Sequence, residues 1–94
     1  MTRRRVIVSG DVQGVYFRDT CRITATRYGV TGWVRNLPDG AVEAVFEGES
    51  DDVARLEAWA HRGPSRAIVG HVYVFEEDPE GLVGFEIRPT PTPW

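Results

Sequence analysis

Segments that favour strands and segments that favour helices alternate in one order along these 94 residues, and this order constrains the fold most strongly. Runs rich in β-branched residues, or alternating apolar with polar residues, indicate strands at 4–10, 30–37, 42–47, 68–76 and 83–88. Helical spacing of apolar and small residues indicates one helix over 17–28 and another from its predicted cap, Ser50, to Gly63-Pro64. The order β-α-β-β-α-β with a short fifth strand predicts an α+β, ferredoxin-like α/β sandwich: an antiparallel sheet with two helices on one face.

The length suits one domain. We expect a single domain over residues 1–94, with a core of about 4–88 and a proline-rich tail at 89–94. No stretch is apolar enough to span a membrane, and the first residues lack the apolar region of a signal peptide. Cys21 is the only cysteine, which excludes an internal disulfide and fits a reducing, cytoplasmic location.

The predicted topology brings two distant segments to the same edge of the sheet. The first and second strands run parallel, with the third strand between them, because the first helix returns the chain to the edge where the first strand began. The C-terminal ends of these two strands therefore lie together. We expect the loop at 11–17 to face Asn36 there.

The loop that leads into the first helix has the composition of an anion-binding site. Gly10 and Gly14 allow tight turns that bring backbone N–H groups close to a ligand, and the start of the helix adds its dipole. Arg18 lies in the first helical turn, where a cation is unfavourable unless an anion lies in front of it, and its guanidinium suits a phosphate. On this pattern alone, a simple turn with a solvated Arg18 is an equal alternative.

Asn36 is the second candidate. An amide side chain can accept a hydrogen bond from a water molecule and donate another to a phosphate oxygen. Because Asn36 precedes the turn signal Pro38-Asp39-Gly40, it could also belong simply to a hairpin turn. Its predicted position opposite the loop favours the functional interpretation.

Two long motifs contain these candidates. The first is Val8-Ser9-Gly10-Asp11-Val12-Gln13-Gly14-Val15-Tyr16-Phe17-Arg18, and the second is Gly32-Trp33-Val34-Arg35-Asn36-Leu37-Pro38-Asp39-Gly40-Ala41-Val42, continuing to Gly48. Together with the shorter segments Gly63-Pro64-Ser65-Arg66-Ala67 and Phe85-Glu86-Ile87, they resemble the acylphosphatase family. The resemblance covers roughly residues 6–88 and leaves out the tail.

The resemblance implies an acylphosphatase, a hydrolase that cleaves the carboxyl–phosphate bond of acyl phosphates to a carboxylate and inorganic phosphate. It implies that the phosphate is bound by Arg18 and by the loop amides of Gln13, Gly14, Val15, Tyr16, Phe17 and Arg18. It also implies that Asn36 orients the attacking water, without metal, cofactor or phosphoenzyme. Because such a loop contacts only the phosphate, we expect the protein to accept substrates with varied acyl groups. We also expect inorganic phosphate and sulfate to compete with the substrate for this loop.

Other reactive and aromatic residues are assigned structural roles. Cys21 falls on the core-facing stripe of the first helix and is expected to be a buried filler. His61 and His71 have no neighbouring metal ligands in the sequence. The remaining aromatic candidates are expected to pack rather than to stack on bases: Trp33, Trp59, Tyr73 and Phe75.

Two non-catalytic alternatives share this topology. An RNA-recognition domain needs exposed aromatic residues on the first and third strands, where only Phe46 occurs, and the net charge of −3 disfavours nucleic acid. An acyl-phosphate-binding accessory domain of a larger carbamoyl-transfer protein is the other alternative. The short tail favours a free-standing enzyme, which we expect to be monomeric, with neither nucleic-acid nor membrane partners.

Overall fold

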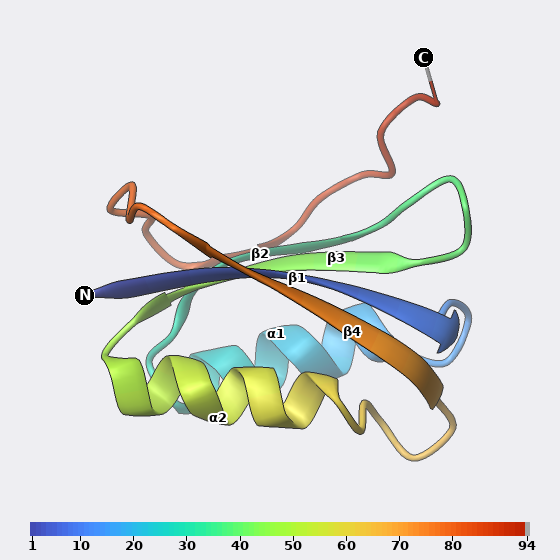
Figure 1. Cartoon of the computed structure of the whole chain (residues 1–94), viewed down its shortest axis with the longest axis horizontal. Helices are drawn as coiled ribbons and strands as arrows, with labels where there is room; N and C mark the ends of the chain where they lie inside the picture. Colours follow the sequence, from blue (N-terminus) through green and yellow to red (C-terminus); the bar gives the residue numbers. More distant parts are fainter. Residues whose placement is uncertain (94) are drawn as a thin grey trace.

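A computed structural model describes residues 1–93 (Figure 1), and Trp94, the last residue of the predicted tail 89–94, lies outside the described residues. The described part contains two helices and five strands, in the order β1 (Thr2–Asp11), α1 (Phe17–Arg27), β2 (Thr31–Asn36), β3 (Val42–Gly48), α2 (Ser50–Ala60), β4 (Ile68–Glu77) and β5 (Phe85–Ile87). The predicted order of elements is confirmed, and the predicted boundaries lie close to the observed ones.

The strands form one sheet in the order β4-β1-β3-β2-β5. β1 pairs antiparallel with β3 and β4, and β3 pairs antiparallel with β2. The ferredoxin-like α+β class is thereby confirmed, and β3 lies between β1 and β2 as the topology predicts. The short β5 pairs in parallel with β2, so the sheet is mixed at this edge, a detail that the sequence does not indicate.

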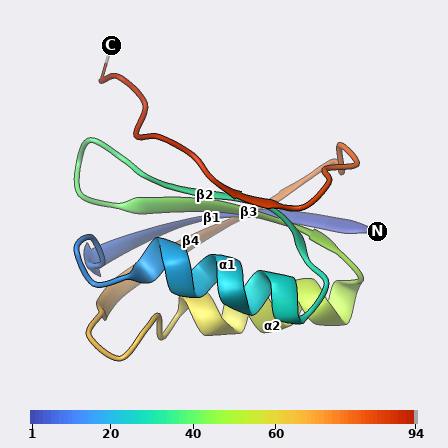
Figure 2. The same cartoon turned by 180° about the vertical axis from the view of Figure 1, so that it is seen from behind.

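Both helices cover the same face of the sheet (Figures 1 and 2). Val6 and Val8 of β1 lie opposite Ala44 and Val42 of β3, and all four are buried. The helices add the buried residues Cys21 and Ala25 from α1, and Val53, Leu56 and Ala60 from α2. Burial raises the pKa of the Cys21 thiol, so Cys21 is the predicted filler rather than a nucleophile.

The opposite face of the sheet carries charged and aromatic side chains. Tyr73 and Phe75 of β4 are 52% and 41% exposed, so the predicted packing role is wrong for both. They alternate with Val72 and Val74, and alternation alone does not tell which set faces the helices. Phe75 lies instead under the guanidinium of Arg5, with 4.4 Å from Cζ to the ring centroid.

Trp33 and Trp59 have the predicted packing roles. Trp33 is buried, and the ring of Trp59 lies 5.0 Å from that of Phe17. Phe46 is completely buried in the core. The aromatic side chain of β3 is therefore not available as the base-stacking platform that the RNA-binding alternative needs.

The helix ends agree in part with the prediction. Helix α1 ends at Arg27 with Tyr28 as its C-cap, close to the predicted end at 28, and Gly29 follows with φ +68, a conformation typical of the residue after a helix C-cap. The prediction that Ser50 caps the second helix is wrong by one residue, because α2 begins at Ser50 and its N-cap is Glu49. The Ser50 hydroxyl lies 2.7 Å from that of Thr2 instead. Within the described residues, neither helix has the length and apolar character needed to cross a membrane.

Candidate active site

The loop between β1 and α1 holds two residues in the left-handed backbone region. Gly14 has φ +72, which glycine adopts easily, whereas Tyr16 has φ +62, a conformation that costs about 1–3 kcal/mol for other residues. Val12 and Phe17 are buried, and Val15 packs against the core. Because these side chains anchor the loop on both sides of Tyr16, the core holds the loop in shape.

Helix α1 begins without a side-chain cap. The N–H of Thr20 donates to the carbonyl oxygen of Tyr16 at 3.1 Å, so the N–H groups of Phe17, Arg18 and Asp19 precede the hydrogen-bond ladder of the helix. Backbone donors of this kind, together with the positive end of the helix dipole, attract anions. The start of α1 therefore offers an anion both donors and a favourable potential.

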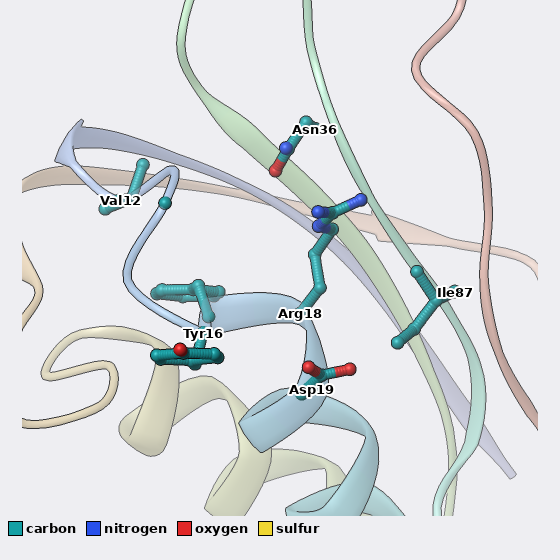
Figure 3. Close-up of a pocket in the computed structure, with 8 residues that line it drawn as sticks. Val12, Tyr16, Arg18, Asp19, Asn36 and Ile87 are labelled. Atoms are coloured by element: carbon teal, nitrogen blue, oxygen red, sulfur yellow. The ribbon is translucent and has the colours of Figure 1, made fainter.

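A pocket of about 380 Å³ lies between this loop and the end of β2 (Figure 3). Arg18 extends from the first turn of α1 towards Asn36, the last residue of β2. Arg18 is the only basic residue among the described residues that line the pocket. Within residues 1–93, neither the Arg18 guanidinium nor the Asn36 amide has a hydrogen-bond or ion-pair partner, so both can bind a ligand.

Four of the six predicted phosphate-binding residues line the pocket together with Asn36: Gly14, Tyr16, Phe17 and Arg18. Gln13 and Val15 do not line it. The Val15 side chain packs against the core, and the Gln13 side chain hydrogen-bonds to the turn that follows β2. Only the backbone N–H groups of these two residues remain candidates for phosphate binding.

Asp19 and Ile87 also line the pocket, and the sequence reasoning missed both. A carboxylate in the first turn of a helix is favoured by the dipole whether or not it has a function, so Asp19 carries no distinct signal. In Figure 3 the Asp19 carboxylate lies on the other side of Arg18 from Asn36. Ile87 reaches the pocket through the parallel pairing of β5 with β2, which the sequence does not reveal.

The two histidines lie outside the pocket. His61 is the C-cap residue of α2 and His71 belongs to β4, and both are exposed. Neither residue lines the pocket. In the part of the chain that the structure describes, no three His, Cys, Asp or Glu side chains are grouped as metal ligands.

Comparisons with known proteins agree over nearly the whole chain. The sequence model of the Acylphosphatase family matches residues 4–87. An acylphosphatase of Rubrobacter xylanophilus is 60% identical over 87 residues, which cover 92% of this chain and 79% of that protein. The structure of an acylphosphatase from Coxiella burnetii matches with a TM-score of 0.89 and 42% identity, over 93% of this chain and 92% of that one. The crystal structure of acylphosphatase from Bacillus subtilis matches with a TM-score of 0.90 and 34% identity, over 94% and 99% of the two chains. The chain therefore belongs to the acylphosphatase family.

Proposed function

We propose that the pocket between the 12–16 loop and Asn36 is where this acylphosphatase hydrolyses acyl phosphates. The observation that carries the proposal is the presence of two partner-free polar side chains, Arg18 and Asn36, in one pocket at the uncapped start of α1. Arg18 is a permanent cation with forked donors, and Asn36 both donates and accepts hydrogen bonds. This combination suits a phosphoryl group with a water molecule beside it.

Arg18 and the backbone N–H groups of residues 13–18 bind the phosphoryl oxygens in this proposal. The guanidinium can donate two parallel hydrogen bonds to these oxygens, and the amides add donors along the bend of the loop. Because the core fixes the loop, the donors need little reorganisation when charge shifts during the reaction. Val12 and Phe17, buried on either side of the loop, support this preorganisation.

Asn36 holds the attacking water in line with the bond that breaks. The water oxygen bonds to phosphorus as the bond between phosphorus and the acyl oxygen breaks, and the carboxylate leaves with the electron pair. The proton of the water passes to a phosphoryl oxygen, so the products are a carboxylate and inorganic phosphate. A carboxylate is a good leaving group, and therefore neither a phosphoenzyme nor a side-chain base is part of the proposal.

Release of inorganic phosphate from acetyl phosphate tests this function. Wild-type protein should turn over steadily, whereas Arg18→Ala should lose kcat/KM by about 100-fold or more. Arg66→Ala is the matched control, because Arg66 is exposed and lies outside the pocket. Binding of acetyl phosphate without turnover would contradict the proposal and indicate the accessory-domain alternative.

A further inference from the structure

The side-chain amide of Gln13 joins the loop at the start of α1 to the turn after β2. Its Nε2 donates to the carbonyl oxygen of Leu37 and to that of Ala41, each at 2.9 Å. Both protons of the amide nitrogen are thereby used. The Gln13 side chain does not line the pocket, so it does not supply donors to a phosphate there.

The two carbonyl groups belong to a turn that is closed by its own hydrogen bonds. Leu37 N–H donates to the Ala41 carbonyl at 2.8 Å, and Gly40 N–H donates to the Leu37 carbonyl at 3.2 Å. The Asp39 carboxylate accepts a further bond from Ala41 N–H at 3.0 Å. These hydrogen bonds tie residues 37–41 to one another, and the turn begins directly after Asn36. A contact that positions the turn therefore positions Asn36.

The Gln13 side chain provides hydrogen bonds between the loop and this turn. The ladder between β1 and β3 ends at the pair Val8 and Val42, before the loop begins. Among the described residues, Gln13 is the only residue of the 12–16 loop whose side chain hydrogen-bonds to the 37–41 turn. The Gln13 side chain thus adds a direct hydrogen-bonded link between the two halves of the pocket to the packing of α1 against β2.

We propose that Gln13 is a positioning residue that holds Asn36 in register with the phosphate-binding loop. This inference rests on the proposed function, in which the loop and Arg18 bind the phosphate while Asn36 orients the water. Phosphate binding uses groups of one segment, so it should tolerate a small shift of the turn. In-line attack requires both segments at a fixed separation, and a displacement of about 1 Å can lower a rate by about 100-fold.

The test replaces Gln13 by methionine, which has a similar length but no donors. Gln13→Met should lower kcat for acetyl phosphate by about 10-fold or more, with inorganic phosphate affinity within about 2-fold of wild type. Glu57→Gln is the stability control, because it weakens the 2.8 Å ion pair between Arg4 and Glu57, away from the pocket. An equal loss of kcat in that control would overturn the inference.

A double variant shows whether Gln13 acts through Asn36. Once Asn36 is alanine there is no amide left to position, so adding Gln13→Met to Asn36→Ala should lower kcat by less than about 2-fold further. If the two substitutions reduce kcat independently, so that their fold-losses multiply in the double variant, the inference is overturned and the proposed function stays intact. The same holds if kcat is unchanged in Gln13→Met but strongly reduced in Asn36→Ala. An unchanged kcat in Asn36→Ala would instead contradict the proposed function.

Discussion

The guanidinium of Arg3 lies 2.8 Å from the carboxylate of Glu47, and both side chains are buried on the face of the sheet opposite to the helices. The same carboxylate accepts hydrogen bonds from the backbone N–H groups of Glu80, Gly81 and Leu82, at 2.8–3.1 Å. These bonds hold the connection between β4 and β5. Because β5 carries Ile87 into the pocket, the network supports one wall of the site as well as the fold.

Stability should therefore fall in acid. Burial alone would raise the pKa of Glu47, but hydrogen bonds from the Glu80 N–H and Arg3 outweigh it and hold this pKa below its ordinary value. Because the pKa of Glu47 is lower in the folded than in the unfolded protein, the ionised carboxylate stabilises the fold at pH values above the unfolded pKa of about 4.3. This contribution is lost as the pH falls through the folded pKa. Urea unfolding between about pH 7 and pH 3 should show this decrease.

Replacing Glu47 tests the same network. Glu47→Gln removes the buried carboxylate charge that binds Arg3 and three backbone N–H groups, and leaves Arg3 with Glu77 at 3.0 Å as its nearest charged partner. The free energy of unfolding at neutral pH should therefore fall by about 3 kcal/mol, and the acid dependence should flatten. Glu86→Gln is the matched control, because Glu86 is exposed and pairs with exposed Arg88; its effect should stay within about 0.5 kcal/mol. Equal effects of the two substitutions would contradict the structural role of Glu47.

Hydrolysis should not need a divalent metal. Arg18 supplies the positive charge in the proposed site, and the described residues contain no grouped set of metal ligands. Dialysis against a chelator should leave phosphate release from acetyl phosphate unchanged. Loss of the activity, followed by recovery when magnesium or zinc is added, would show that a metal takes part.

Asp19 follows Arg18 in the sequence, and its carboxylate also lines the pocket. It is therefore the alternative candidate for a general base. Because the substrate oxygen takes the proton in our proposal, Asp19→Asn should keep most of kcat. Removing its negative charge should strengthen phosphate binding by a factor of about three. His61→Gln and His71→Gln, both outside the pocket, serve as controls and should also keep most activity. A large fall in kcat in folded Asp19→Asn alone would identify Asp19 as the base.

Inorganic phosphate and sulfate should compete with the substrate, because the loop recognises a tetrahedral oxyanion whatever is attached to it. Binding to the native state alone stabilises the protein by about 2.7 kcal/mol at 100 times the Kd, so the Tm should rise with anion concentration. When phosphate is titrated into the protein, the NMR signals of the backbone amides from Gly14 to Arg18 should shift. Signals that stay unchanged in this segment while others move would place the anion elsewhere.

Local sequence patterns were sufficient to predict the helices and strands, because each pattern lies within a short stretch of neighbouring residues. Period-2 alternation predicted β3, and helical spacing of apolar and small residues predicted α1 and α2. The meeting of the loop with Asn36 followed from topology alone, since the ends of β1 and β2 must share an edge once β3 lies between them. Neither step needed a side-chain contact.

The unpredicted features depend on contacts between distant segments. The hydrogen bonds of Gln13 join residues 24 and 28 positions apart, and those of Glu47 join residues more than 30 positions apart. The exposure of Tyr73 depends on which face of β4 the helices cover. A residue's own type and its immediate neighbours contain no signal for such contacts.

The most direct test of the site compares phosphate affinity with turnover in Asn36→Ala. Because Asn36 is proposed to contact mainly the water, kcat for acetyl phosphate should fall by about 10²–10³-fold, while phosphate affinity should stay within about 2-fold of wild type. Asn36 adjoins the 37–41 turn, so unfolding must be measured alongside, with an expected loss of at most about 1–2 kcal/mol. A collapse of phosphate affinity together with kcat, in a folded variant, would make Asn36 a substrate clamp and contradict its role in orienting the water.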